Sequence, residues 1–159
     1  MSTGLRPGEV EDLNVFLVAF EESGEPEKAA QVDELLRSLV PDRLDVNLAD
    51  KVGVLGYSLE RTGVAEGRFR LFFRCLETLD VDYTLWLHQY EEGTEEFVSL
   101  DRRLSTSRWE AGRVYEERWP VELATGEVRF VFGFWRWEDE SRLWVKGEPG
   151  QHEIDLGWR

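Results

Sequence analysis

The sequence predicts a mainly β protein: an antiparallel β-sandwich, immunoglobulin-like or jelly-roll-like, of about seven or eight strands after a helical hairpin. From about residue 46 onward, apolar and polar residues alternate with a period near two, which is typical of half-buried strands. Turn residues separate these runs at hairpin spacing, and no helical crossover lies between them. Before residue 41 the period is that of amphipathic helices.

Residues 1–44 form the helical segment of this prediction. One apolar stripe over residues 8–22 consists of Val10, Leu13, Phe16, Leu17 and Phe20. Ser23 and Gly24 break this pattern, Pro26 suits the first turn of a second helix, and Pro41 ends that helix. Two helices joined by a short glycine-containing turn make an αα-hairpin. We expect this hairpin to pack on the β-sandwich or to link it to a partner.

Residues 45–159 form the β-sandwich domain. The expected strands cover residues 52–59, 67–77, 82–91, 97–104, 113–123, 126–138, 142–146 and 153–157. A parallel α/β fold is excluded, because it requires helices between successive strands. In the longest strand, Val128, Phe130, Phe132 and Phe134 alternate with Val131, Trp135 and Trp137. Aromatic residues on both faces predict a further layer of cover over the sheet, for which the helical hairpin is the candidate.

The acidic composition limits the kinds of partner that the chain is expected to bind. A net charge of −14 repels nucleic acid phosphates and anionic membrane surfaces, so we expect no nucleic acid ligand. No run approaches the ~18 apolar residues of a membrane span, and the N-terminus lacks a secretory signal pattern. The chain is therefore expected to be soluble, and cytoplasmic if complete, but extracytoplasmic if it belongs to a longer membrane protein. The oligomeric state is left open.

No cofactor or metal site is expected. Cys75 is the only cysteine, which excludes an intramolecular disulfide and a multi-cysteine metal site. Its apolar neighbours indicate a small core residue. The glutamates around Gly93 lack the spacing of a calcium loop and indicate a solvated hairpin tip.

Four segments carry a resemblance to a known family. They are residues 50–57 (DKVGVLGY), 82–88 (DYTLWLH), 106–112 (TSRWEAG) and 132–135 (FGFW). In this order they resemble the soluble β-sandwich tail of bacterial membrane glycosyltransferases of the dolichyl-phosphate-mannose protein mannosyltransferase type. The sequence departs from the common pattern at Trp86, Gln89 and Trp135. The resemblance implies an accessory domain, because the transferase active site belongs to the membrane part of that family.

Residues 24–42 resemble the second half of a tetratricopeptide unit. Such helices also occur near tails of this kind, which agrees with the helical start of the chain. A single repeat cannot bury its own apolar face, so it needs another surface to pack on.

His88, flanked by Trp86 and Tyr90 on one face of its strand, has two interpretations. It is a structural histidine with ring nitrogens hydrogen-bonded between the sheets, or it is a ligand or general base. A base needs a nucleophile, but no Gly-x-Ser-x-Gly elbow, His-x-x-x-His spacing or Cys/His pair accompanies it. We therefore nominate no catalytic residue.

The seven tryptophans are too many for one small core. Trp135 and Trp137 share a face with Arg129, and Trp144 belongs to an adjacent strand in this prediction. Either the helical hairpin covers this face, or the indoles stack on sugar rings. The candidate ligand-binding residues are Trp86, His88, Arg129, Trp135, Trp137 and Trp144. The hypotheses are, in order, a non-catalytic accessory module for a protein partner, a carbohydrate-binding module, and a glycan-active enzyme.

Overall fold

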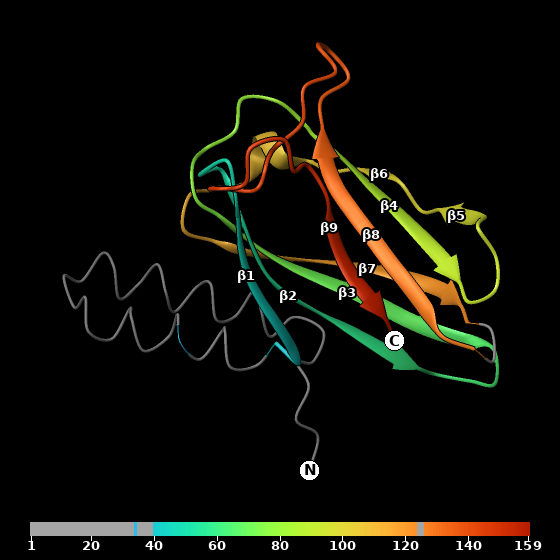
Figure 1. The fold of residues 1–159 in the computed structure, drawn as a ribbon. Coiled ribbons are helices and arrows are strands. Elements are labelled where there is room, and N and C mark those ends of the chain that lie inside the picture. Colours follow the sequence, from blue (N-terminus) through green and yellow to red (C-terminus); the bar gives the residue numbers. More distant parts are fainter. Residues whose placement is uncertain (1–33, 35–39, 124–125) are drawn as a thin grey trace.

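The computed structural model describes residue 34, residues 40–123 and residues 126–159, and these form two antiparallel sheets (Figure 1). The first sheet has the order β1-β2-β3-β7. Its strands are β1 (Asp42–Leu48), β2 (Val52–Arg61), β3 (Glu66–Cys75) and β7 (Val114–Glu122). The second sheet has the order β5-β4-β8-β9, and β6 also pairs with β4. Its strands are β4 (Thr84–Glu91), β5 (Phe97–Ser99), β6 (Arg102–Arg103), β8 (Val128–Trp135) and β9 (Ile154–Trp158).

The core lies between the two sheets and is centred on phenylalanines of β3 and β8. The Phe69 ring stacks on Phe130 with centroids 4.1 Å apart and planes 6° apart. Farther along the same strands, Phe73 meets Phe134 edge to face at 5.4 Å. All four side chains are almost completely buried, so these contacts join the two sheets through large apolar surfaces.

The predicted mainly β class is confirmed, and period-two patterns located six strands: β2, β3, β4, β7, β8 and β9. Apart from residues 34 and 40, the helical segment expected before residue 41 lies outside the described residues. The prediction counted residues 42–44 with the helical segment, whereas β1 begins at Asp42. This strand was missed because a bulge between Arg43 and Val46, with Asp45 at a φ of 54°, interrupts the alternation.

Two predicted strands differ in the structure. The segment 97–104 is divided into β5 and β6, because the Asp101 carboxylate accepts the backbone N–H of Leu87 at 2.8 Å where the ladder would otherwise continue. The expected strand at 142–146 is reduced to two isolated bridges, Arg142 with Trp135 and Val145 with Leu48.

Cys75 is fully buried in the core, as expected for a small apolar residue. Its Sγ lies 3.3 Å from the Glu77 carbonyl oxygen, to which it donates a weak hydrogen bond. Burial raises the pKa of the Cys75 thiol. The nucleophilic thiolate is therefore disfavoured at neutral pH.

The Phe69–Phe130 stack predicts that Phe130→Ala lowers the free energy of unfolding by about 3–5 kcal/mol, through lost burial and a cavity. Phe97→Ala is the matched control, because that ring lies on the surface, 49% exposed. It should cost about 1 kcal/mol or less. Urea denaturation followed by tryptophan fluorescence measures both values, and equal losses would contradict this view of the core.

Cys75 should react with a disulfide reagent such as Ellman's reagent far more slowly in the native protein than in denaturant. The raised pKa lowers the thiolate fraction at a given pH, and the fold excludes the reagent. Labelling under native conditions and in guanidinium chloride measures the difference. Equal rates would show that the thiol is accessible.

Candidate functional site

The outer face of the second sheet carries a group of aromatic side chains. Because the phenylalanines of β8 point into the core, Val131, Gly133 and Trp135 point outward. Antiparallel pairing places Trp86 opposite Gly133 and His88 opposite Val131. We name this surface the aromatic face and define it by Trp86, His88, Tyr90, Phe97, Trp135 and Trp137.

Stacking contacts hold the aromatic face together. The His88 ring stacks on Phe97 with centroids 4.0 Å apart and planes 18° apart, and it contacts Trp86 at 5.0 Å. Trp135 contacts Trp137 at 4.7 Å. His88 thus lies outside the core, and the interpretation of a histidine hydrogen-bonded between the sheets is wrong.

Gly133 allows the Trp86 indole to lie close to the sheet. A Cβ atom added at Gly133 would stand 2.7 Å from Trp86 Nε1 and 2.5 Å from the His152 carbonyl oxygen, both closer than a Cβ contact permits. A glycine is therefore required at this point for steric reasons. Among the described residues, Trp86 Nε1 has no hydrogen-bond partner although the atom is buried.

A depression of about 410 Å³ opens on the aromatic face. It is lined by Trp86, His88, Tyr90, Asp101, Trp135, Arg142 and Glu153. We name it the aromatic pocket. Indoles and rings thus lie beside two carboxylates and one guanidinium, which combines apolar surface with hydrogen-bonding groups.

The charged groups of the aromatic pocket differ in whether they already interact with another group of the protein. His88 Nε2 lies 3.8 Å from Asp101 Oδ1, which already accepts the Leu87 N–H. The side chains of Arg142 and Glu153 have neither an ion-pair nor a hydrogen-bond partner among residues 40–123 and 126–159. They are therefore able to bond a ligand without breaking an internal contact.

Arg129 and Trp144, two predicted site residues, lie beside the aromatic pocket. The Arg129 guanidinium lies over the rings of Tyr90 at 4.7 Å and Trp158 at 5.6 Å, with Asp155 at 3.7 Å, so it is already engaged. Trp144 lines a separate depression with Pro149 and other residues of the segment between β8 and β9.

Two of the predicted tryptophans are exposed, whereas Trp86 and Trp135 are half-buried. Trp137 is 63% exposed and Trp144 is 52% exposed. The helical hairpin that was expected to cover the face of Trp135 and Trp137 lies almost entirely outside the described residues, so its covering of this face stays a prediction.

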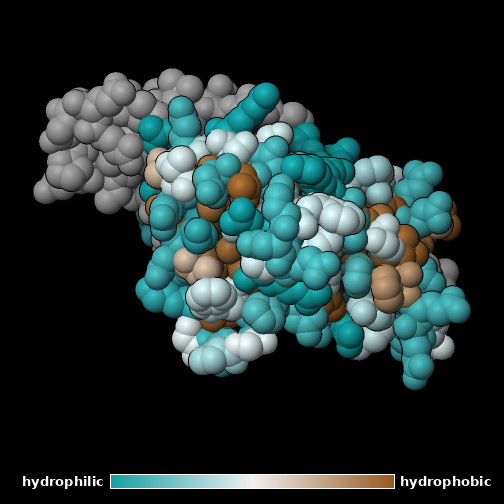
Figure 2. Space-filling view, turned by 90° about the horizontal axis from the view of Figure 1, so that it is seen from above, coloured by the Kyte–Doolittle hydropathy of each residue, from teal (hydrophilic) through white to brown (hydrophobic). Residues whose placement is uncertain are grey.

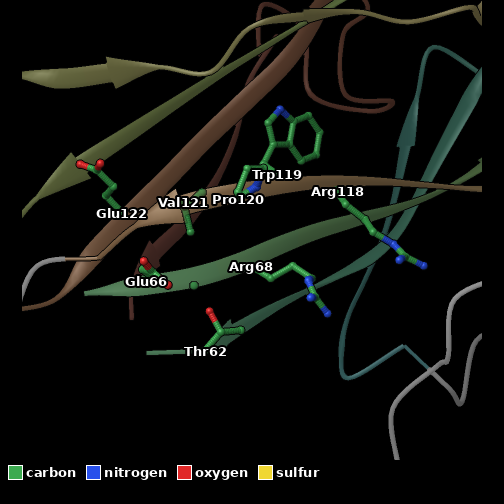
Figure 3. A pocket seen from close by; sticks show the side chains of 9 residues that line it. Thr62, Glu66, Arg68, Arg118, Trp119, Pro120, Val121 and Glu122 are labelled. Atoms are coloured by element: carbon green, nitrogen blue, oxygen red, sulfur yellow. The ribbon is translucent and has the colours of Figure 1, made fainter. Parts of the chain in front are cut away.

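The outer face of the first sheet offers less to a ligand. Its centre is buried, with Arg70 bonded to Ser58 and lying 3.6 Å from Glu116. A depression of about 640 Å³ opens near the start of β3 and the end of β7 (Figure 3). Figure 3 shows Arg68 and Arg118 extending from the same side, with the Trp119 ring on the opposite side. Arg118 is bound by Glu116 at 2.7 Å, and Trp119 belongs to the core, so this depression has no free aromatic platform.

Hydrophobic surface is also present near the edge strand β5, where Phe97 and Val98 are exposed. Figure 2 shows a largely hydrophilic surface from above, with hydrophobic side chains left of the centre and also at the end of the molecule where β5 lies in Figure 1. This hydrophobic area adjoins the aromatic face through Phe97.

The structure brings Trp86, His88 and Trp135 together in one pocket, and Trp137 packs against Trp135 at its side with the two rings tilted by 41°. Sequence reasoning missed Asp101, Arg142 and Glu153 as site residues. They come from the break between β5 and β6 and from the segment before β9, where no period indicates a shared location.

Two kinds of site are not found within the described ranges. No group of three or more histidine, cysteine, aspartate or glutamate side chains there is arranged to hold a metal ion. Nor does this part of the chain contain a helix long and apolar enough to cross a membrane.

Comparison with known proteins gives no family assignment. The sequence matches no protein-family model, and no curated protein matches it significantly.

Gly133→Ala should lower the free energy of unfolding by about 1–3 kcal/mol and displace the Trp86 indole, because the new methyl group overlaps both indole and backbone. Gly53→Ala is the matched strand control, since a Cβ there meets its nearest atom at an ordinary 3.7 Å. Urea denaturation and the NMR shift of the Trp86 indole N–H measure the two effects. An unshifted Trp86 signal in Gly133→Ala would contradict the close packing.

Proposed function

We propose that this domain is a non-catalytic accessory module that binds carbohydrate through the aromatic pocket. The observation that carries the proposal is the placement of Trp86 and Trp135 in one depression with the unpaired side chains of Arg142 and Glu153. This proposal combines the accessory module with the carbohydrate-binding module, the first two hypotheses drawn from the sequence.

The chemistry of a sugar ring fits this combination. The apolar C–H face of a pyranose buries well on an indole, and its hydroxyl groups need hydrogen-bond partners at the ring edge. Arg142 can donate to hydroxyl oxygens, while Glu153 and Asp101 can accept from hydroxyl groups. Charged groups make the stronger of such hydrogen bonds.

A non-catalytic role is supported by the composition of the pocket. Its lining contains no serine, threonine or cysteine that His88 could activate, and His88 lies 3.8 Å from Asp101 without a hydrogen bond, so the lining offers a catalytic reaction only the carboxylates Asp101 and Glu153. The resemblance to glycosyltransferase tail domains also implies an accessory role. The immunoglobulin-like or jelly-roll-like affiliation and the tetratricopeptide-like hairpin are parts of the same proposal.

A protein partner is the second candidate, and the edge strand β5 favours it. β5 pairs with β4 on one side only, and it exposes Phe97 and Val98. An exposed apolar edge strand is a place where another chain can add a strand. β5 has only three residues, so such pairing would be short.

A glycan array tests the carbohydrate proposal. We expect binding to at least one glycan class, weakened about tenfold or more by Trp135→Ala, because stacking and buried apolar area are lost together. Trp137→Ala should weaken it less, since that indole lies beside the pocket. Trp158→Ala is the control, an exposed tryptophan of the same sheet outside the pocket.

Absence of binding to every glycan would overturn the carbohydrate proposal and leave the protein partner at β5. Release of new reducing ends from a bound glycan would overturn the non-catalytic assignment. In that case Asp101 and Glu153 would be the carboxylates to substitute first.

A further inference from the structure

We infer that the aromatic pocket is one end of a longer groove that ends at Trp144, and that its ligand is a linear oligosaccharide of several sugar rings. This inference rests on the proposed function. It assigns a role to Trp144 and to the segment between β8 and β9, which the aromatic pocket alone leaves without one.

Continuity of the groove follows from shared lining residues. The aromatic pocket shares Arg142 and Glu153 with a neighbouring depression of about 540 Å³. That depression in turn shares Pro149, Gly150 and His152 with a third one, of about 270 Å³, which contains Trp144. Each depression therefore adjoins the next through residues that line both.

The chemistry changes along this path. Trp86 and Trp135 provide indoles at one end, and Trp144 provides a half-exposed indole at the other. Between them the lining is polar and includes Arg142 and Gln151. A chain of sugar rings presents apolar faces for stacking and a continuous series of hydroxyl groups for such a polar stretch. A single sugar could occupy only one part.

The Trp144 end is fixed to the rest of the fold before any ligand binds. The Trp144 carbonyl oxygen accepts the N–H of Ala49 at 2.9 Å, and the Lys146 N–H donates to the Asn47 carbonyl oxygen at 2.9 Å. The Lys146 ammonium also pairs with Asp50 at 2.8 Å. These bonds attach the segment to β1 and the turn after it, so little ordering is needed on binding.

Near Trp144 the groove is lined by two glycines whose backbone is exposed. Gly147 and Gly150 have φ of +83° and +85°, and a Cβ added at either would meet no atom within 4 Å. The tight turn is closed by the Gln151 N–H to the Glu148 carbonyl oxygen at 3.0 Å and the Val145 N–H to the Gln151 carbonyl oxygen at 2.8 Å. Glycine thus serves the turn and also leaves backbone accessible to a ligand.

Chain-length dependence of affinity tests the inference. We would measure dissociation constants by isothermal titration calorimetry for cello-, chito- and manno-oligosaccharides, from disaccharide to hexasaccharide. The wild-type protein should bind the hexasaccharide of its preferred series about tenfold or more tightly than the disaccharide, because only the longer chain reaches Trp144.

Three variants test the contributions of the two ends of the groove to binding. Trp144→Ala should remove the advantage of the hexasaccharide and leave disaccharide binding unchanged. Trp135→Ala should weaken both, and Trp158→Ala, outside the groove, should weaken neither. The Trp144 indole N–H signal should shift in NMR spectra with hexasaccharide but not with disaccharide, which provides a measurement without substitution.

The outcomes distinguish this inference from the proposed function. Equal affinities for disaccharide and hexasaccharide, or an unchanged hexasaccharide affinity in Trp144→Ala, would overturn the groove while leaving the aromatic pocket as a carbohydrate site. Equal weakening of both ligands by Trp144→Ala would also overturn it. Binding of none of the three series, together with a negative glycan array, would overturn both.

Discussion

The stack of Phe69 on Phe130, with Phe73 against Phe134 beside it, is the contact on which the rest of the structure depends. β3 and β8 lie inside their sheets, so these phenylalanines fix which side of each sheet is the core. Strand side chains alternate with a period of two, and a shift of one residue in β8 would exchange its faces. The burial of four phenylalanines therefore determines that Gly133 and Trp135 point outward.

The outer faces of the two sheets differ in how far their polar side chains are already bonded within the protein. On the first sheet, Arg70 is buried and engaged by Ser58 and Glu116, so its polar groups stabilise the fold. On the second sheet, Gly133 gives space for Trp86, and the indoles remain accessible beside side chains without internal partners. A ligand at the first face would have to replace existing bonds, whereas at the second it would make new ones. This asymmetry is the physical reason to place binding on the second sheet.

The sequence was informative wherever one local period determined the structure. Alternation in β3, β4 and β8 gave these strands and grouped Trp86 with His88 on one face of β4, whereas their position beside Trp135 follows only from the strand pairing. Asp101 could not be found in this way, because its place depends on a carboxylate that interrupts a ladder. Arg142 and Glu153 depend on the path of the segment before β9, which is set by turns and by bonds to β1.

Three of the four segments behind the family resemblance, residues 82–88, 106–112 and 132–135, contact one another. Trp86 of residues 82–88 lies over Gly133 of residues 132–135. Asp82 accepts the Ser107 N–H at 3.0 Å and the Ser107 hydroxyl at 2.6 Å, and these bonds lower the pKa of the Asp82 carboxyl. Their joint occurrence is thus explained by packing, and it does not by itself specify a ligand.

Charge restricts the class of carbohydrate that such a surface would take. The chain has a net charge of −14, and the aromatic pocket contributes two carboxylates against one guanidinium. A sulfated or uronate-rich glycan would approach against this field, and Arg142 alone would have to offset its charges. A neutral glycan meets no such repulsion, and its hydroxyl groups can donate to Asp101 and Glu153. The same carboxylates that give the protein its acidity would then act as hydrogen-bond acceptors for a neutral chain.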